Sequence, residues 1–227
     1  MGFLDSIFGK RGDQEKPQEN PAACPYCGTV LQTPPTSSRK CPACGDKIVV
    51  RTRRSDGAKL YLTATDARAF DAERKADAIR NKAIRAAANI GLDRTAFERM
   101  EGELLAKAPG YGPGDVFWAL ANKLSAKQMR GGDWHGLSMT FFEQALWLYE
   151  TGRPYEQLKV EAEKARAQDY ALQGIRQLKI MGGCCDNCGR FQSRIYPIEQ
   201  TLREWPVPVE ECTNGWCVCT WLLVVPD

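Results

Sequence analysis

The sequence has only one histidine among its 227 residues, His135, which stands between Trp134 and Gly136. It also lacks three common catalytic motifs: the His-Glu-x-x-His metal motif, the glycine-rich phosphate loop and the Gly-x-Ser-x-Gly nucleophile turn. A lone histidine without a partner motif gives no support for acid–base catalysis. These absences predict a protein that is not an enzyme.

Long apolar runs are also missing. No stretch of eighteen consecutive apolar residues occurs, so the sequence predicts no membrane-spanning helix. The N-terminus does not show the cationic and apolar pattern of a secretory signal, and we therefore expect a cytoplasmic protein. The net charge of +3 is too small to indicate a partner by itself.

What the sequence does contain is cysteine, ten residues in two groups. The first group is two C-x-x-C pairs, each with proline after its first cysteine and glycine after its second. Such a repeated pattern, in a chain expected in the reducing cytosol, predicts a four-thiolate zinc ribbon with a closed, structural site. Two disulfides or a redox C-x-x-C pair are the alternatives. The four predicted ligands are Cys24, Cys27, Cys41 and Cys44.

Most of the positive charge lies beside these cysteines. The stretch 39–59 holds seven cations and two acids. Residues 48–53 and 59–63 read as two strands, and Asp56-Gly57 between them is a hairpin signal. The hairpin is predicted to contact nucleic-acid phosphates, with Tyr61 available for base stacking, or alternatively to be a solvated face. The candidate contact residues are Arg51, Arg53, Arg54 and Lys59.

The first ten residues have a short amphipathic pattern, with apolar side chains on one helical face. This pattern predicts weak contact with a membrane surface or a partner protein, and a frayed terminus is the alternative. Residues 11–22 are polar and contain proline, and they read as a flexible linker.

The middle of the chain reads as helical. An alanine-rich helix is predicted over 65–90, capped by Thr65 and ended by Gly91. Four more helices follow. They are expected at 94–107, 116–130, 136–150 and 155–180, with Asp93 and Asp115 opening the first two. The last pair has the pattern of a single tetratricopeptide-like hairpin, but no copy follows at a repeat period, so we expect a plain helical hairpin.

Six cysteines near the C-terminus form the second group. Cys185, Cys188, Cys212 and Cys217 can complete a second zinc site, while Cys184 and Cys219 are spare or replace a ligand. The spacing does not choose between these sets. A redox dithiol is the alternative, since Cys184 and Cys185 are adjacent.

Several features of this segment follow one another in a recognisable order. They are Cys185-x-x-Cys188, Ile195-Tyr196-Pro197, Pro206 and Pro208, Cys217-Val218-Cys219, and the apolar stretch 222–226. The segment resembles the C-terminal module of phage minor head (head-morphogenesis) proteins, although Cys212 replaces a usual histidine and Val218 a usual arginine. The whole chain is similar to uncharacterised bacterial and phage zinc-ribbon proteins. This resemblance implies a prokaryotic or phage origin and two zinc sites, with no assigned activity.

Together these patterns predict a mainly α-helical chain with two small zinc-bound β modules. The expected divisions are a flexible segment at 1–22, a zinc ribbon at 23–64, a helical domain at 65–180 and a cysteine module at 181–227. The predicted function is a zinc-binding, non-enzymatic adaptor whose basic hairpin binds nucleic acid or a protein. A phage or mobile-element assembly factor and a thiol-based redox enzyme are the alternatives.

Overall fold

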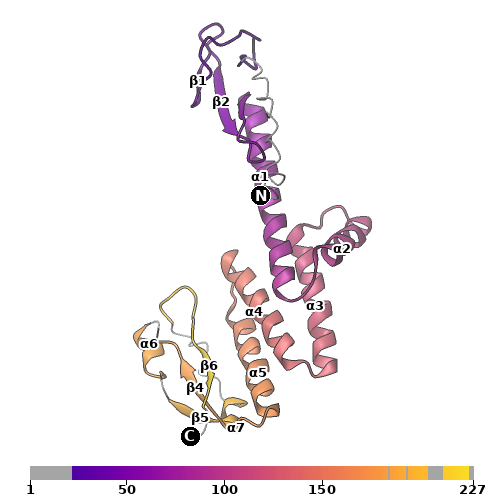
Figure 1. Cartoon of the computed structure of the whole chain (residues 1–227), viewed down its shortest axis with the longest axis vertical. Coiled ribbons are helices and arrows are strands. Elements are labelled where there is room, and N and C mark those ends of the chain that lie inside the picture. The colour runs from indigo at the N-terminus through magenta and orange to yellow at the C-terminus, as the bar shows by residue number, and fades with distance from the viewer. Residues whose placement is uncertain (1–21, 184, 193, 204–211, 225–227) are drawn as a thin grey trace, which may run out of the picture. The chain divides into compact units, whose positions relative to one another are not determined.

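The computed structural model describes residues 22–183, 185–192, 194–203 and 212–224 (Figure 1). It confirms a mainly helical chain with two small sheets, one near each group of cysteines. The chain forms two compact units, residues 1–75 and 76–227. The predicted helix at 1–10 and residues 11–21 of the predicted linker lie outside the described residues, and the four domain boundaries remain predictions.

The first unit contains a three-stranded antiparallel sheet with the order β1-β2-β3. Its strands are β1 (Arg39–Lys40), β2 (Lys47–Thr52) and β3 (Lys59–Leu62). Strands β2 and β3 form the predicted hairpin, and Gly57 takes the positive φ of 73° that its turn requires. The small core beneath the sheet contains Leu31, Ile48 and two of the cysteines, and Tyr61 packs against it.

Helix α1 (Ala64–Asn89) is separated from β3 by Thr63 alone. Its cap is Thr63, whose Oγ1 accepts a hydrogen bond from the Asp66 backbone N–H at 3.1 Å. The prediction that Thr65 caps this helix is wrong, because Thr65 already lies within the first turn. Thr63 is the cap because it directly precedes the first helical residue, where its hydroxyl can reach a free N–H group.

The second unit continues with four more helices, which lie near their predicted positions. They are α2 (Arg94–Lys107), α3 (Pro113–Gly131), α4 (Trp134–Glu150) and α5 (Glu156–Leu172). Asp93 caps α2 as predicted. Asp115 lies inside the first turn of α3, where its carboxylate accepts from the Gly112 N–H at 2.8 Å, so the helix starts earlier than expected.

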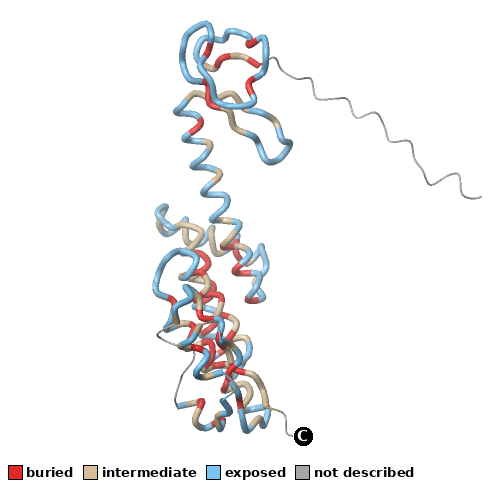
Figure 2. The backbone as a smooth tube through the Cα atoms, turned by 90° about the vertical axis from the view of Figure 1, so that its left-hand side faces the viewer, coloured by how far each residue is buried: buried red, intermediate tan, exposed pale blue. Residues whose placement is uncertain are grey.

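Alanines of α1 pack closely in the core of this unit. Ala83 and Ala87 are fully buried against Phe97 and Phe117. Small side chains allow the helix backbone to approach large aromatic rings, which explains how a helix with so few large apolar residues is held. Figure 2 shows the buried positions running along the helices of this unit.

The predicted helix at 155–180 is too long. Helix α5 ends at Leu172, and Gly174 takes a φ of 82° that a helix does not allow. Strand β4 (Gln177–Met181) follows, with Leu178 and Ile180 buried and their neighbours exposed. Burial that alternates from one residue to the next over 177–181 is the period of a strand and not of a helix.

The C-terminal segment folds around β4. Its elements are α6 (Asp186–Gly189), β5 (Ile195–Pro197), α7 (Ile198–Thr201) and β6 (Thr220–Leu223). The sheet has the order β5-β4-β6 and is antiparallel, and β6 lies beside α5 (Figure 1). Ile195-Tyr196-Pro197 forms strand β5, whereas Pro206 and Pro208 lie outside the described residues. Among the described helices, none is both long enough and apolar enough to cross a membrane.

Candidate metal centres and the surfaces beside them

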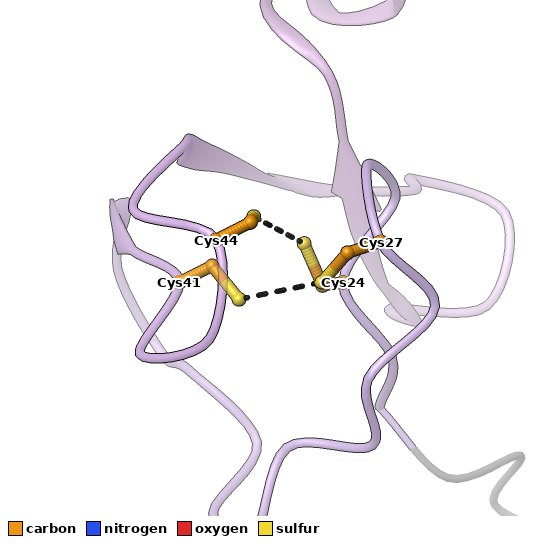
Figure 3. Close-up of side chains that lie close together, drawn as sticks. All are labelled: Cys24, Cys27, Cys41 and Cys44. Atoms are coloured by element: carbon orange, nitrogen blue, oxygen red, sulfur yellow. Dashed lines mark hydrogen bonds between the residues drawn. The ribbon is translucent and has the colours of Figure 1, made fainter.

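The four cysteines of the ribbon converge on one point (Figure 3). The sulfur atoms of Cys24 and Cys44 are 3.8 Å apart, and so are those of Cys27 and Cys41. All four lie within 4.8 Å of one another. Four thiolates around an ion at a zinc–sulfur distance of about 2.3 Å are separated by about 3.8 Å, so the spacing fits a tetrahedral metal site. It does not fit disulfides, whose sulfur atoms are about 2 Å apart.

The two knuckles share one backbone pattern, which is what their duplicated sequence predicts. Gly28 N–H donates to the Cys24 carbonyl and Gly45 N–H to the Cys41 carbonyl, both at 2.9 Å. Both glycines have positive φ, 72° and 81°. Only glycine takes this conformation without strain, which is why each C-x-x-C pair is followed by one.

The thiols of the ribbon are unequal. Hydrogen bonding with the Thr29 side chain, 3.3 Å from the sulfur, lowers the pKa of Cys27 to about 6. The backbone N–H of Cys44 lowers the pKa of Cys41. At Cys44 the backbone of Asp46 opposes the rise, but desolvation and the neighbouring thiols raise the pKa to about 12. Crowded thiols cannot all ionise unless a cation lies among them.

Two of the four predicted nucleic-acid residues are held in ion pairs. The Arg51 guanidinium binds both carboxylate oxygens of Asp71 on α1, the shortest contact being 2.7 Å. Arg53 binds both oxygens of Asp56 in the hairpin turn, and the shortest of these contacts is 2.5 Å. These pairs fix the hairpin turn and connect the sheet to α1 within the first unit.

Other cations of the ribbon are not held in this way. Lys59 donates to the Thr52 hydroxyl at 2.8 Å. Lys40 and Lys47, which are both exposed, stand directly opposite each other on β1 and β2. Within the described residues, no carboxylate lies within ion-pair distance of Lys40, Lys47, Lys59 or Arg54. Tyr61 packs against the ribbon core, whereas Tyr26 is 42% exposed on the first knuckle.

The C-terminal cysteines form two overlapping groups of three. Cys185, Cys188 and Cys212 are one group, and Cys188, Cys217 and Cys219 are the other, each with its sulfurs within 4.8 Å of one another. Cys185 and Cys212 are 3.9 Å apart, as are Cys188 and Cys217. The structure thus brings all five described cysteines together, while Cys184 lies outside the described residues. No disulfide joins any of the nine cysteines that the structure describes.

A cluster of aromatic rings fixes the loop that carries two of these cysteines. Trp216 stacks on Tyr155 with ring centroids 4.7 Å apart, and it also meets Tyr149 at 5.2 Å and Phe142 at 5.6 Å. Phe142 and Tyr149 belong to α4, and Tyr155 is the N-cap residue of α5. The loop between Cys212 and Cys217 is therefore anchored to the helical hairpin by its tryptophan.

The Tyr155 hydroxyl completes this anchor. It donates to the Gly215 carbonyl at 2.9 Å and accepts from the Cys217 N–H at 3.3 Å. Burial raises the pKa of this phenol, which keeps it protonated and able to donate. One side chain of the hairpin therefore positions the backbone on both sides of Trp216.

A buried polar network links α5 to β6. Lys159 and Glu163 are buried and lie 2.8 Å apart. Glu163 also accepts from the Thr220 hydroxyl at 3.0 Å, and Arg166 donates to Thr220 and approaches Glu163 at 3.5 Å. Lys159 Nζ lies 4.9 Å from the centre of the Phe142 ring. A buried charge pair with these extra bonds favours one arrangement of helix and strand.

The single histidine does not join any of these clusters. His135 lies in the first turn of α4. Its side chain is 77% exposed, and Nδ1 lies 3.8 Å from a carboxylate oxygen of Asp169. This is the environment of a surface residue.

Sequence patterns located the cysteines but missed the anchor of Trp216 and the Lys159–Glu163 network. The only sequence signal for the latter is the spacing of four between Lys159 and Glu163, which is common on exposed helices. No protein-family model matches this chain, and no curated protein or solved structure matches it either. The structure by itself supports two cysteine-rich centres able to hold metal ions.

Proposed function

We propose that this chain is a zinc-binding, non-enzymatic adaptor whose basic ribbon contacts the phosphate backbone of nucleic acid. Zinc suits the ribbon because four thiolates in a tetrahedral array are its preferred structural site. The ion holds the two knuckles in place, and the knuckles hold β1 and β2. Its role is therefore to support a charged surface.

The observation that carries the proposal is the pairing of Lys40 with Lys47 across two strands. Like charges directly opposite each other in a sheet cost about 0.2–1 kcal/mol. A phosphate between the two ammonium groups would turn this repulsion into attraction. Arg54 and Lys59 add positive charge at the other end of the same sheet.

The ion pairs divide the predicted contact residues into two roles. Arg51 and Arg53 are assigned to the internal structure of the first unit, because Asp71 and Asp56 neutralise their charge. Four cations that have no carboxylate within ion-pair distance among the described residues are assigned to phosphate contact. They are Lys40, Lys47, Arg54 and Lys59.

Two double variants of equal charge test this division. Binding of the zinc-loaded full chain to a fluorescent DNA or RNA oligonucleotide is measured by anisotropy over a series of salt concentrations. K40A/K47A is expected to reduce the slope of log K against log salt by about 2. R51A/R53A, with the same loss of charge, should leave the slope close to that of the native chain.

Two outcomes count against the proposal. Absence of binding at low salt removes nucleic acid as the partner. Equal loss of slope in both double variants shows that net charge alone, and not the Lys40–Lys47 surface, drives binding. Circular dichroism of each variant confirms that it is folded before its slope is compared.

A further inference from the structure

The five described cysteines near the C-terminus do not gather as the ribbon cysteines do. In the ribbon, all four sulfurs lie within 4.8 Å of one another, as one tetrahedral ion requires. In the C-terminal segment, the described sulfurs fall into two groups of three at the same limit, with Cys188 common to both. One ion at the centre of either group does not reach all five thiols.

The second group is a built site. Cys188, Cys217 and Cys219 are at most 1% exposed. Cys219 is placed by the sheet, because it directly precedes β6 and lies next to the Met181–Thr220 pair of the β4–β6 register. Burial raises the pKa of its thiol, although a hydrogen bond with the Gly183 backbone opposes the rise.

The Cys219 sulfur lies close to the backbone at Gly182, where there is no room for a side chain. A Cβ atom added at Gly182 would lie 2.3 Å from the Cys219 Sγ, so any larger residue there would displace the sulfur. The Cys217 N–H is held by the Tyr155 hydroxyl at 3.3 Å. Both outer members of the second group are thus fixed by contacts that do not depend on a metal.

We propose that the C-terminal module holds two soft divalent metal ions that share the thiolate of Cys188. One ion binds Cys185, Cys188 and Cys212, and the other binds Cys188, Cys217 and Cys219. Thiolate sulfur can bridge two zinc-like ions, and soft ligands select such ions. The shared sulfur is the one at the meeting point of the two groups, and it is completely buried.

Charge supports two ions over one. Five thiolates around a single divalent ion leave three uncompensated charges in a largely buried cluster, or force buried thiols to stay protonated. A second ion neutralises most of this charge and allows all five thiols to ionise, with the protons released to solvent. Each ion retains one coordination position for a donor beyond the five thiolates.

The first test is the metal content of the reduced, zinc-loaded full chain by native mass spectrometry. The proposal expects three zinc ions per chain, one in the ribbon and two in the C-terminal module, which is one more than the sequence pattern predicts. C219S should lose one of them, and C27S, the ribbon control, should lose the ribbon ion alone. Two ions in the native chain, or an unchanged count in C219S, overturns the proposal.

The shared thiolate has its own test. With cadmium-113 in place of zinc, the two C-terminal ions should give two NMR signals split by coupling through the common sulfur. A single C-terminal signal, or two signals without coupling, contradicts the bridge. In C188S both C-terminal ions should be lost while the ribbon signal remains, and loss of only one ion contradicts the shared ligand. The ribbon signal shows in each case that the chain is still able to bind metal.

Discussion

Removal of one oxygen atom tests how the C-terminal cysteine loop is attached to the helices. In Tyr155→Phe the ring that stacks on Trp216 is kept, but the hydroxyl that bonds Gly215 and Cys217 is lost. Each hydrogen bond contributes about 1 kcal/mol net, and a buried partner left without a bond costs about 1–3 kcal/mol. Gly215 is exposed and its carbonyl regains water, whereas Cys217 is 1% exposed and its N–H does not. We expect a loss of about 2 kcal/mol in the free energy of unfolding.

Thermal unfolding followed by tryptophan fluorescence measures this loss cleanly. All six tryptophans lie beyond residue 75, so the signal reports the second unit alone. A loss of about 2 kcal/mol should lower its Tm by about 4–8 °C. Zinc transfer from the C-terminal module to a chromogenic chelator should also become faster.

Tyr149→Phe is the matched control. Tyr149 belongs to the same aromatic cluster, but within the described residues its hydroxyl makes no hydrogen bond, and the residue is 39% exposed. Its Tm should change by less than about 2 °C. If the two variants have the same Tm, or if Tyr155→Phe releases zinc at the native rate, the hydroxyl does not anchor the loop.

Four other outcomes follow from the structure. Cys24→Ser should expose residues 22–63 to rapid proteolysis, because structural zinc supplies much of the folding energy of such small modules, and native resistance would contradict this. Gly45→Ala should cost about 1 kcal/mol at its φ of 81°, seen as weaker zinc retention by the ribbon. Phe117→Ala should lower the stability of the second unit by about 3–5 kcal/mol, since the ring is fully buried, and a loss below 1 kcal/mol would place it outside the core. Hydrogen bonds from Arg53 lower the pKa of Asp56 to about 2. The contribution of this pair to folding stability is therefore fully present above the usual pKa of aspartate and is lost as the pH falls towards 2. An NMR titration that finds an unshifted Asp56 carboxyl would contradict the pair.

The elements predicted best from the sequence are those whose signals are local. The C-x-x-C pairs with their glycines, the Asp56-Gly57 hairpin and the Asp93 cap each depend on a few neighbouring residues. The predicted start of α1 and the predicted end of α5 are less accurate, since these helices begin at Ala64 and end at Leu172. Thr63 and Thr65 are both good caps by type, and only the end of β3 decides between them.

The features that could not be predicted depend on contacts between distant segments. Trp216 and Tyr155 are far apart in the sequence, and the residues next to either of them do not predict that their rings stack. The sequence does not reveal the ion pair of Arg51, because its partner Asp71 lies twenty residues away on a helix. The predicted contact of Arg51 with nucleic acid therefore took no account of this pair. The ligand pattern near the C-terminus also depends on the β4–β6 register, which places Cys219 beside Cys188.

The ribbon metal centre is tested most directly by the native mass of the reduced full chain beside that of Cys41→Ser. We predict that the native chain carries bound zinc and that the variant carries one ion fewer, because the ribbon site has lost a ligand. A native chain with the mass of the bare polypeptide, or a variant that carries the same number of ions as the native chain, would contradict the claim that the ribbon cysteines form a metal centre.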